Sequence, residues 1–239
     1  MMKRPLSELN FIEGEVLLFD KPLDWTSFDV VRKIRWKIFH YLKKTKIKVG
    51  HAGTLDPKAT GLMIICTGKK TKEIENFQAF EKEYIAELYL GATRPSYDLE
   101  TQIDKYYPNE HISIELINEK LKNFIGEQEQ IPPGYSAKWI DGQRAYTKAR
   151  KGIEVEMKPS KIVIHELEVL DFELPILKIR IKCSKGTYIR SLANDIGIVL
   201  KSGAYLANLR RVKIGNFKVE NAIKIEDFQF DNANLLQTC

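Results

Sequence analysis

The chain has 239 residues, of which 44% are hydrophobic and 29% charged, and its formal net charge is +6. Its apolar runs are far shorter than the roughly 20 residues that cross a bilayer, and no apolar stretch follows the basic N-terminus to form a secretory signal. Cys66, Cys183 and Cys239 are odd in number and have no paired spacing, and the histidines are scattered, which argues against a disulfide framework or a zinc site. We therefore expect a cytoplasmic protein with no membrane segment and no bound metal.

The first predicted elements are a buried strand and a basic helix. Residues 15–20 predict a buried strand that ends at Lys21-Pro22, and Ser27 offers an N-cap for a helix that runs to about Lys44. Apolar residues recur at helical spacing and are predicted to face inward: Val31, Ile34, Ile38 and Leu42. The cationic residues of this helix then point mostly outward.

A lone carboxylate follows the basic helix. Between Val30 and Leu55 the sequence holds no Asp or Glu, and the next acid, Asp56, lies in a loop rich in Gly and Pro at residues 50–61. Asp56 is either a turn residue, since Asp before Pro avoids the helical region, or a nucleophile or base that acts on a polyanionic substrate attracted by the positive charge. The basic pI indicates an acidic partner, of which nucleic acid is the commonest.

The remaining elements mix strands and helices. Residues 81–90 alternate with period two, which places Tyr84 on the same face of a strand as core residues. Residues 126–156 are rich in turns and predict an inserted arm that carries a short basic helix at about 143–151. The other predicted elements are strands at 62–67, 162–172, 176–183 and 205–214 and helices at 71–78, 113–124 and about 187–200. This order predicts an α+β architecture with a mixed sheet.

Six short segments then occur in an order typical of one enzyme family. They are Lys21-Pro22-x-x-x-Thr26-Ser27, the loop from His51 to Gly61, Lys82-x-Tyr84, Pro132-Pro133-x-Tyr135-Ser136-Ala137, Lys185-Gly186-Thr187-Tyr188-Ile189-Arg190-Ser191 and Leu209-Arg210-Arg211. In this order they resemble the TruB family of pseudouridine synthases, bacterial enzymes that isomerise uridine 55 in the T arm of tRNA. The resemblance covers roughly residues 14–217.

The resemblance implies a fold, a partner and an assembly state. The implied fold is the pseudouridine synthase fold, in which helices flank a mixed, mostly antiparallel central sheet and an RNA-gripping arm is inserted. We expect a single catalytic domain over residues 1–239, with the arm at about 126–156. The implied partner is the T-arm stem-loop of tRNA. The implied enzyme needs no cofactor and no obligatory protein partner, and we expect a monomer.

The resemblance also implies roles for individual residues. Asp56 matches the catalytic aspartate, and whether its oxygen attacks the sugar, attacks the ring or removes a sugar proton stays open. Arg190 matches the arginine that pairs with this aspartate, and Tyr84 matches the tyrosine that stacks on the target base. Lys21 and Pro22 match a pair that supports the active-site loop. Substrate-pocket positions are matched by Tyr188 and Leu209, and His51 matches a histidine that stacks against the RNA loop when the base flips out.

Cationic side chains of the basic helix and the arm are expected to contact phosphates, with an affinity that falls as salt rises. These residues are Arg32, Lys33, Lys43, Lys44, Arg144 and Arg150. Two departures from the family are Asp24, where a glycine is usual, and Trp139, where the arm usually has lysine. The few residues after Phe217 predict that the chain lacks the C-terminal PUA domain of many relatives.

Three other functions fit the sequence less well. Guide-RNA-dependent synthases share the catalytic core, but their need for a PUA domain argues against them. An RNA-binding or tRNA-folding module without catalysis conflicts with the intact set of Asp56, Tyr84 and Arg190. A nucleotide hydrolase is disfavoured because Gly68-Lys69-Lys70-Thr71 is not a phosphate-binding loop, which needs a glycine where Met63 stands.

Overall fold

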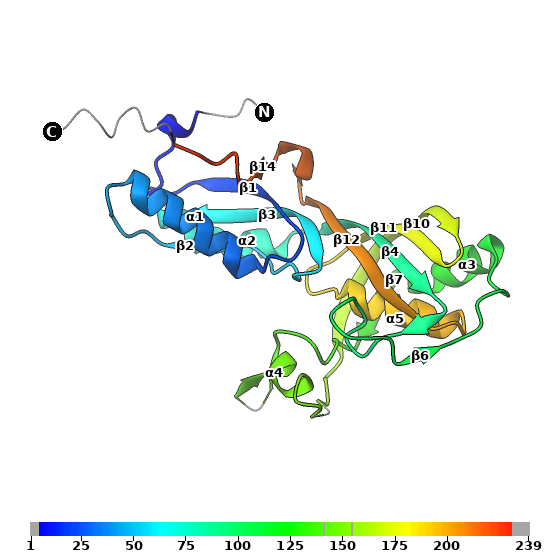
Figure 1. Cartoon of the computed structure of the whole chain (residues 1–239). Coiled ribbons are helices and arrows are strands. Elements are labelled where there is room, and N and C mark those ends of the chain that lie inside the picture. The colour runs from blue at the N-terminus through cyan, green and yellow to red at the C-terminus, as the bar shows by residue number, and fades with distance from the viewer. Residues whose placement is uncertain (1–4, 141, 154, 231–239) are drawn as a thin grey trace. The chain divides into compact units, whose positions relative to one another are not determined.

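The computed structural model describes residues 5–140, 142–153 and 155–230 (Figure 1). They form two compact units, which we call the first unit (Met1–Phe80 with Arg211–Cys239) and the second unit (Glu81–Arg210). Strand β12 (Ala204–Ile214) runs from the second unit into the first. The predicted α+β class, with a mixed and mostly antiparallel sheet and several helices, is confirmed. Within the described ranges, no helix is long and apolar enough to span a bilayer.

The sheet of the first unit is built around two central strands. Strand β1 (Val16–Lys21) pairs in parallel with β14 (Ile223–Lys224) and antiparallel with β3 (Ala59–Thr67). The short β2 (Val49–His51) also pairs with β3, and β13 (Phe217–Lys218) pairs with the end of β12. The strands predicted at 15–20 and 62–67 are confirmed, whereas β2, β13 and β14 were not predicted.

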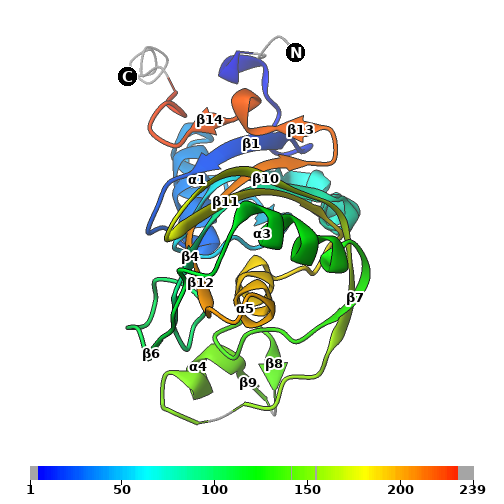
Figure 2. The same ribbon diagram turned by 90° about the vertical axis from the view of Figure 1, so that its right-hand side faces the viewer.

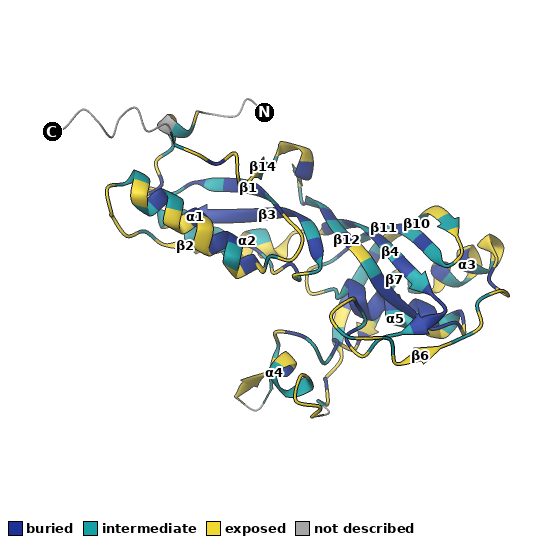
Figure 3. Cartoon of the chain, in the orientation of Figure 1, coloured by how far each residue is buried: buried dark blue, intermediate teal, exposed yellow. Residues whose placement is uncertain are grey.

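Alternating side chains of β1 and β3 give the first unit a hydrophobic core on each face of its sheet. Helix α1 (Ser27–Tyr41) covers one face through Val30, Val31, Ile34 and Ile38, which pack with Leu17, Phe19, Met63 and Ile65. Helix α2 (Ile74–Ala79), which follows a 3₁₀ helix at Gly68–Glu73, packs on the other face with Leu62, Ile64 and Cys66. Figure 3 shows β3 buried along nearly its whole length.

The predicted start of α1 is wrong by one residue. Thr26, not Ser27, is the N-cap, because the Thr26 hydroxyl accepts a hydrogen bond from the Asp29 N–H while the Asp29 carboxylate accepts one from the Thr26 N–H. This reciprocal pair is a capping box, which satisfies two backbone donors at the start of the helix. The hydroxyl of Ser27 is thereby left to bind elsewhere.

The second unit holds a curved antiparallel sheet. Strand β11 (Ile176–Cys183) pairs with β4 (Lys82–Leu90) and with β10 (Ser160–Glu173), which in turn pairs with β7 (Gly126–Gln130). Figure 2 shows helices α3 (Ile114–Leu121) and α5 (Ile189–Val199) on the same side of this sheet. The predicted alternation of β4 is confirmed, with Tyr84, Ala86, Leu88 and Leu90 all buried.

The segment predicted to form the arm contains several short elements. Its first residues form β7, an edge strand of the sheet, and the segment beyond contains β8 (Trp139–Ile140), β9 (Gln143–Arg144) and the short helix α4 (Ala145–Ala149). Asp141 and Glu154 of this segment, like Cys239, lie outside the described residues. The remaining short elements are β5 (Ala92–Thr93), β6 (Lys105–Tyr106) and 3₁₀ helices at Leu6–Glu8, Lys122–Phe124 and Val219–Asn221.

Candidate active site

Asp56 lies in the loop between β2 and β3, half-buried and next to a tightly held backbone segment. The preceding residue, Leu55, is buried, and its N–H donates to the Ser27 hydroxyl oxygen at 2.8 Å. The same hydroxyl donates to the Leu55 carbonyl at 3.0 Å. The first residue of α1 therefore fixes the backbone immediately before the carboxylate.

Lys21, at the end of β1, supports the other side of this loop. Its side chain is fully buried, and its Nζ donates to the carbonyls of Trp25 (2.6 Å), Pro22 (2.8 Å) and Pro57 (3.3 Å). Burial lowers the pKa of Lys21 from 10.5 to about 8, and the negative charge of Asp56 is the largest influence that opposes this shift. The contact with Pro57 agrees with the supporting role predicted for Lys21.

A buried arginine that we did not assign to the site holds the loop from a third direction. The guanidinium of Arg211, only 1% exposed, donates from Nε to the Leu62 carbonyl at 2.8 Å, from Nη2 to Gly53 at 3.2 Å and from Nη1 to Thr54 at 3.3 Å. Its backbone also passes so close to Gly61 (φ +109°) that a Cβ there would lie 2.3 Å from the Arg211 carbonyl oxygen. The only signal in the sequence was the position of Arg211 in the Leu-Arg-Arg motif.

His51 ends β2 in the same unit and is partly buried. Burial is the main cause of a lowered pKa of its imidazole, and the positive charge of Arg211 lowers this pKa further. The neutral ring is therefore favoured at pH 7. A neutral, partly buried ring suits stacking better than it suits an ion pair with phosphate.

Arg190 is a buried residue of the second unit, in the first turn of α5. Its side chain is only 4% exposed, its Nη1 donates to the carbonyls of Tyr135 at 3.0 Å and Ser96 at 3.3 Å, and its Nε lies 3.6 Å from Oδ2 of the buried Asp98. Arg190 is therefore an internal residue of the second unit and does not lie on the solvent-facing side of α5. These contacts also fix the orientation of the planar guanidinium. A lysine at this position has a single amine and could not make the same set of oriented contacts.

The other predicted pocket residues of the second unit lie on its sheet and at the start of α5. Tyr84 is buried on β4, opposite Ile181 of β11, and Leu209 is buried on β12. Tyr188 is the N-cap of α5, and its backbone is held by the buried amide of Gln130, which accepts from the Tyr188 N–H at 2.8 Å and donates to its carbonyl at 3.0 Å. Gln130 was not predicted, because nothing in its polar strand marks it as buried.

The structure thus places Asp56 and His51 in the first unit and Tyr84, Tyr188, Arg190 and Leu209 in the second. Among the described residues, no group of three or more His, Cys, Asp or Glu side chains is arranged to hold a metal ion. The pairing of Asp56 with Arg190 stays a prediction.

The cationic residues predicted to contact RNA are at the surface, and several of them already have partners within the chain: Arg32 donates to Asp29 at 2.9 Å, and Arg144 donates to the Ala137 carbonyl. Arg150 donates from Nε (2.9 Å) and Nη2 (2.7 Å) to the Glu100 carboxylate, so that a phosphate would have to compete with or share this contact. The exposed members of this set are Arg32, Lys33, Lys43, Lys44, Arg144 and Arg150.

Two models of known protein families match most of the chain. The model described as TruB family pseudouridylate synthase (N terminal domain) matches residues 40–189, and that described as tRNA pseudouridylate synthase B C-terminal domain matches residues 190–236. A protein of Phocaeicola vulgatus called tRNA pseudouridine synthase B is 60% identical over 92% of this chain and 94% of its own length. The protein of the same name from Parabacteroides distasonis is 56% identical over 94% of this chain and 97% of its own length.

Solved structures give the same fold. A chain in the crystal structure of a Cbf5-Nop10-Gar1 complex matches 94% of this chain with a TM-score of 0.69 and 30% identity. A chain in the structure of an H/ACA RNP bound to a substrate RNA containing 2'-deoxyuridine matches 94% with a TM-score of 0.65 and 29% identity. This chain spans 56% and 55% of the lengths of those two chains.

Proposed function

Because this chain belongs to the TruB family of pseudouridylate synthases, we propose that it isomerises uridine 55 in the T arm of tRNA to pseudouridine. The observation that carries the proposal is the loop of Asp56, which lies within the matched region and is held by Lys21, Ser27 and Arg211. A carboxylate that must meet a reacting atom benefits from such a fixed backbone, since small errors in placement are costly in rate.

The reaction rearranges bonds within one nucleotide. The bond between C1' of the ribose and N1 of uracil breaks, the base turns, and a bond forms between C1' and C5. The proton on C5 leaves and a proton joins N1, so product and substrate have the same composition. The balance requires neither an oxidant nor a reductant.

Asp56 supplies the carboxylate for this rearrangement, as a nucleophile toward the sugar or the ring or as a base toward a sugar proton. Arg190 is the proposed ion-pair partner of Asp56, oriented by its contacts with Asp98 and with two carbonyls. Tyr84 stacks on the target base and is the candidate that moves the C5 proton.

The target base must first leave its stack, which costs a few kcal/mol. Tyr188 and Leu209 are proposed to line the pocket that receives it, and the neutral imidazole of His51 is proposed to stack against the RNA loop from which the base has left. Exposed cations of α1 and of the arm hold the phosphates without reading sequence. Recognition of the uridine then rests on the shape of the RNA loop and on base flipping.

The direct test is to incubate the purified chain with a uridine-bearing T-arm stem-loop RNA, without ATP or added metal, and to map pseudouridine at single-nucleotide resolution. We expect conversion of the uridine equivalent to position 55 and of no other position. No product at any position from folded protein would contradict the proposal.

A second candidate function follows from the likeness to chains solved in protein and RNA complexes: guide-RNA-dependent modification. The same assay separates the two functions. Conversion of the bare stem-loop by the isolated chain supports the T-arm function. Conversion that appears only after a guide RNA or a protein partner is added supports the second candidate.

A further inference from the structure

The outer side of α1 carries two adjoining hollows that share Arg32 and Trp36. The first hollow has a volume of about 640 Å³, and its lining also includes Trp25 and Lys33. The second hollow has a volume of about 410 Å³, and its lining also includes Arg35. We call the two together the α1 groove.

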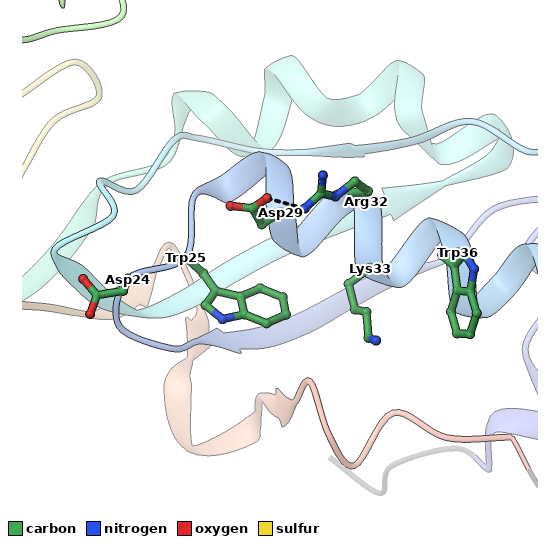
Figure 4. A pocket seen from close by; sticks show the side chains of 6 residues that line it. All are labelled: Asp24, Trp25, Asp29, Arg32, Lys33 and Trp36. Carbon is green, nitrogen blue, oxygen red and sulfur yellow. Dashed lines mark hydrogen bonds and ion pairs between the residues drawn. The ribbon is translucent and has the colours of Figure 1, made fainter.

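Trp36 is the most unusual residue of the α1 groove, because 54% of its surface is exposed while the opposite side of α1 carries the buried apolar residues. The Lys33 ammonium lies 5.3 Å from the centre of the Trp36 ring, and the ring of His40 lies 4.2 Å away. Figure 4 shows the indoles of Trp25 and Trp36 on the same side of α1, with the Lys33 side chain between them. These contacts hold the indole of Trp36 at the surface.

The charge of the α1 groove is positive. Its two acids have cationic partners, since Asp24 accepts from Lys58 at 2.7 Å and Asp29 accepts from Arg32 at 2.9 Å. Lys33 and Arg35 add further positive charge. An exposed aromatic ring among cations matches a nucleotide, whose base stacks on the ring while its phosphate meets the cations. An acidic peptide would match the charge but gives the indole no planar partner.

We propose that the α1 groove binds an unpaired nucleotide of the RNA substrate, outside the uridine that is isomerised, with its base stacked on Trp36 and its phosphate near Lys33 and Arg35. The inference rests on the proposed function for the presence of RNA. Ser27, which holds the backbone before Asp56, and Trp36 lie on one helix, about 14 Å apart along its axis at 1.5 Å per residue. An RNA bound at the Asp56 loop can span this distance with a few nucleotides.

Tryptophan fluorescence of the full chain tests the inference. The double variant Trp25→Phe, Trp139→Phe leaves Trp36 as the single indole, and the probes are a short oligouridylate and inorganic polyphosphate. We expect oligouridylate to quench Trp36 and polyphosphate to leave it nearly unchanged. In the otherwise native chain, Trp36→Ala should weaken oligouridylate binding by about fivefold to a hundredfold, the range typical of one stacked base.

Two controls make the result specific. Tyr106→Ala removes another exposed aromatic side chain, 73% exposed in β6, and should leave the affinity unchanged. Urea unfolding of Trp36→Ala should match that of the native chain. Equal affinity of Trp36→Ala and the native chain, or equal quenching by polyphosphate, would overturn the inference, and so would tighter binding of polyglutamate than of oligouridylate. Failure of the native chain to make pseudouridine would instead contradict the proposed function.

Discussion

At the scale of single residues, the backbone around Asp56 is held by buried donors. A loop lacks the regular hydrogen bonds of a strand, so its buried carbonyls need partners from side chains. Lys21 and Arg211 provide these partners with five N–H···O contacts between 2.6 and 3.3 Å in length to the segments at residues 22–25 and 53–57. Burial of two cations is costly, and the carbonyls offset part of this cost.

Replacement of Lys21 by methionine should lower the free energy of unfolding by about 1–3 kcal/mol, because the partly buried carbonyls of Pro22 and Trp25 lose their Lys21 donor and that of Pro57 keeps the Asp24 N–H alone. Lys58→Met is the matched control, since Lys58 is exposed and its bond to Asp24 is a surface ion pair. That variant should cost less than about 1 kcal/mol. Urea unfolding at pH 7 measures both values, and equal effects of the two variants would refute the supporting role of Lys21.

The pKa of Lys21 adds a pH dependence with a definite sign. Burial places this pKa at about 8 in the folded chain, against an ordinary value of 10.5. Between these two values the unfolded chain binds more protons, so stability rises with pH across this window. The native chain should therefore gain stability relative to Lys21→Met from pH 8 to pH 10.5. A constant or falling difference would show that Lys21 is not desolvated.

At the scale of secondary-structure elements, the close approach of β12 to β3 within the first unit requires a glycine. Gly61 and Gly126 have similar positive φ values of +109° and +104°, but only Gly61 has backbone atoms where a Cβ would lie, 2.3 Å from the Arg211 carbonyl oxygen. A Cβ on Gly126 would meet nothing within 4 Å. The two sites therefore separate backbone strain from steric overlap.

Alanine at these two positions should have clearly different effects. Gly126→Ala should cost about 1–3 kcal/mol from backbone strain alone. Gly61→Ala should cost at least about 2 kcal/mol more, since β12 must move away and Arg211 must move with it. Thermal unfolding of both variants compares the costs, and equal losses would show that the approach of β12 is not tight.

The elements that the sequence predicts best are those with a strong hydrophobic period. Strand β4 and helix α1 were predicted because every second or every third to fourth residue is apolar. Strand β7 was missed because its sequence, Gly-Glu-Gln-Glu-Gln, has no apolar period and lies at the sheet edge. The partners of Arg211 could not be predicted at all, since they lie about 150 residues earlier in the chain. Asp56 and Arg190 were identified through family motifs, not through periodicity.

At the scale of the whole molecule, positive charge is distributed unevenly. On the sheet of the second unit, cations pair with acids on neighbouring strands, as in Arg180 with Glu168 at 2.9 Å and Lys182 with Glu166 at 3.1 Å. The segment from Val30 to Leu55 has cations but no acid in its sequence. The attraction of a polyanion is therefore expected to be strongest at α1 and the turn that follows it, and to weaken as salt rises.

The whole account depends on one carboxylate, and a comparison of the native chain with Asp56→Asn tests it most directly. Single-turnover conversion of the T-arm stem-loop should fall by at least about a thousandfold in Asp56→Asn, while RNA affinity stays within a few fold. Asp171→Asn makes the same chemical change at an exposed position of β10 and should leave the rate unchanged. If Asp56→Asn converts the stem-loop within about tenfold of the native rate, Asp56 does not carry the reaction and the account is wrong.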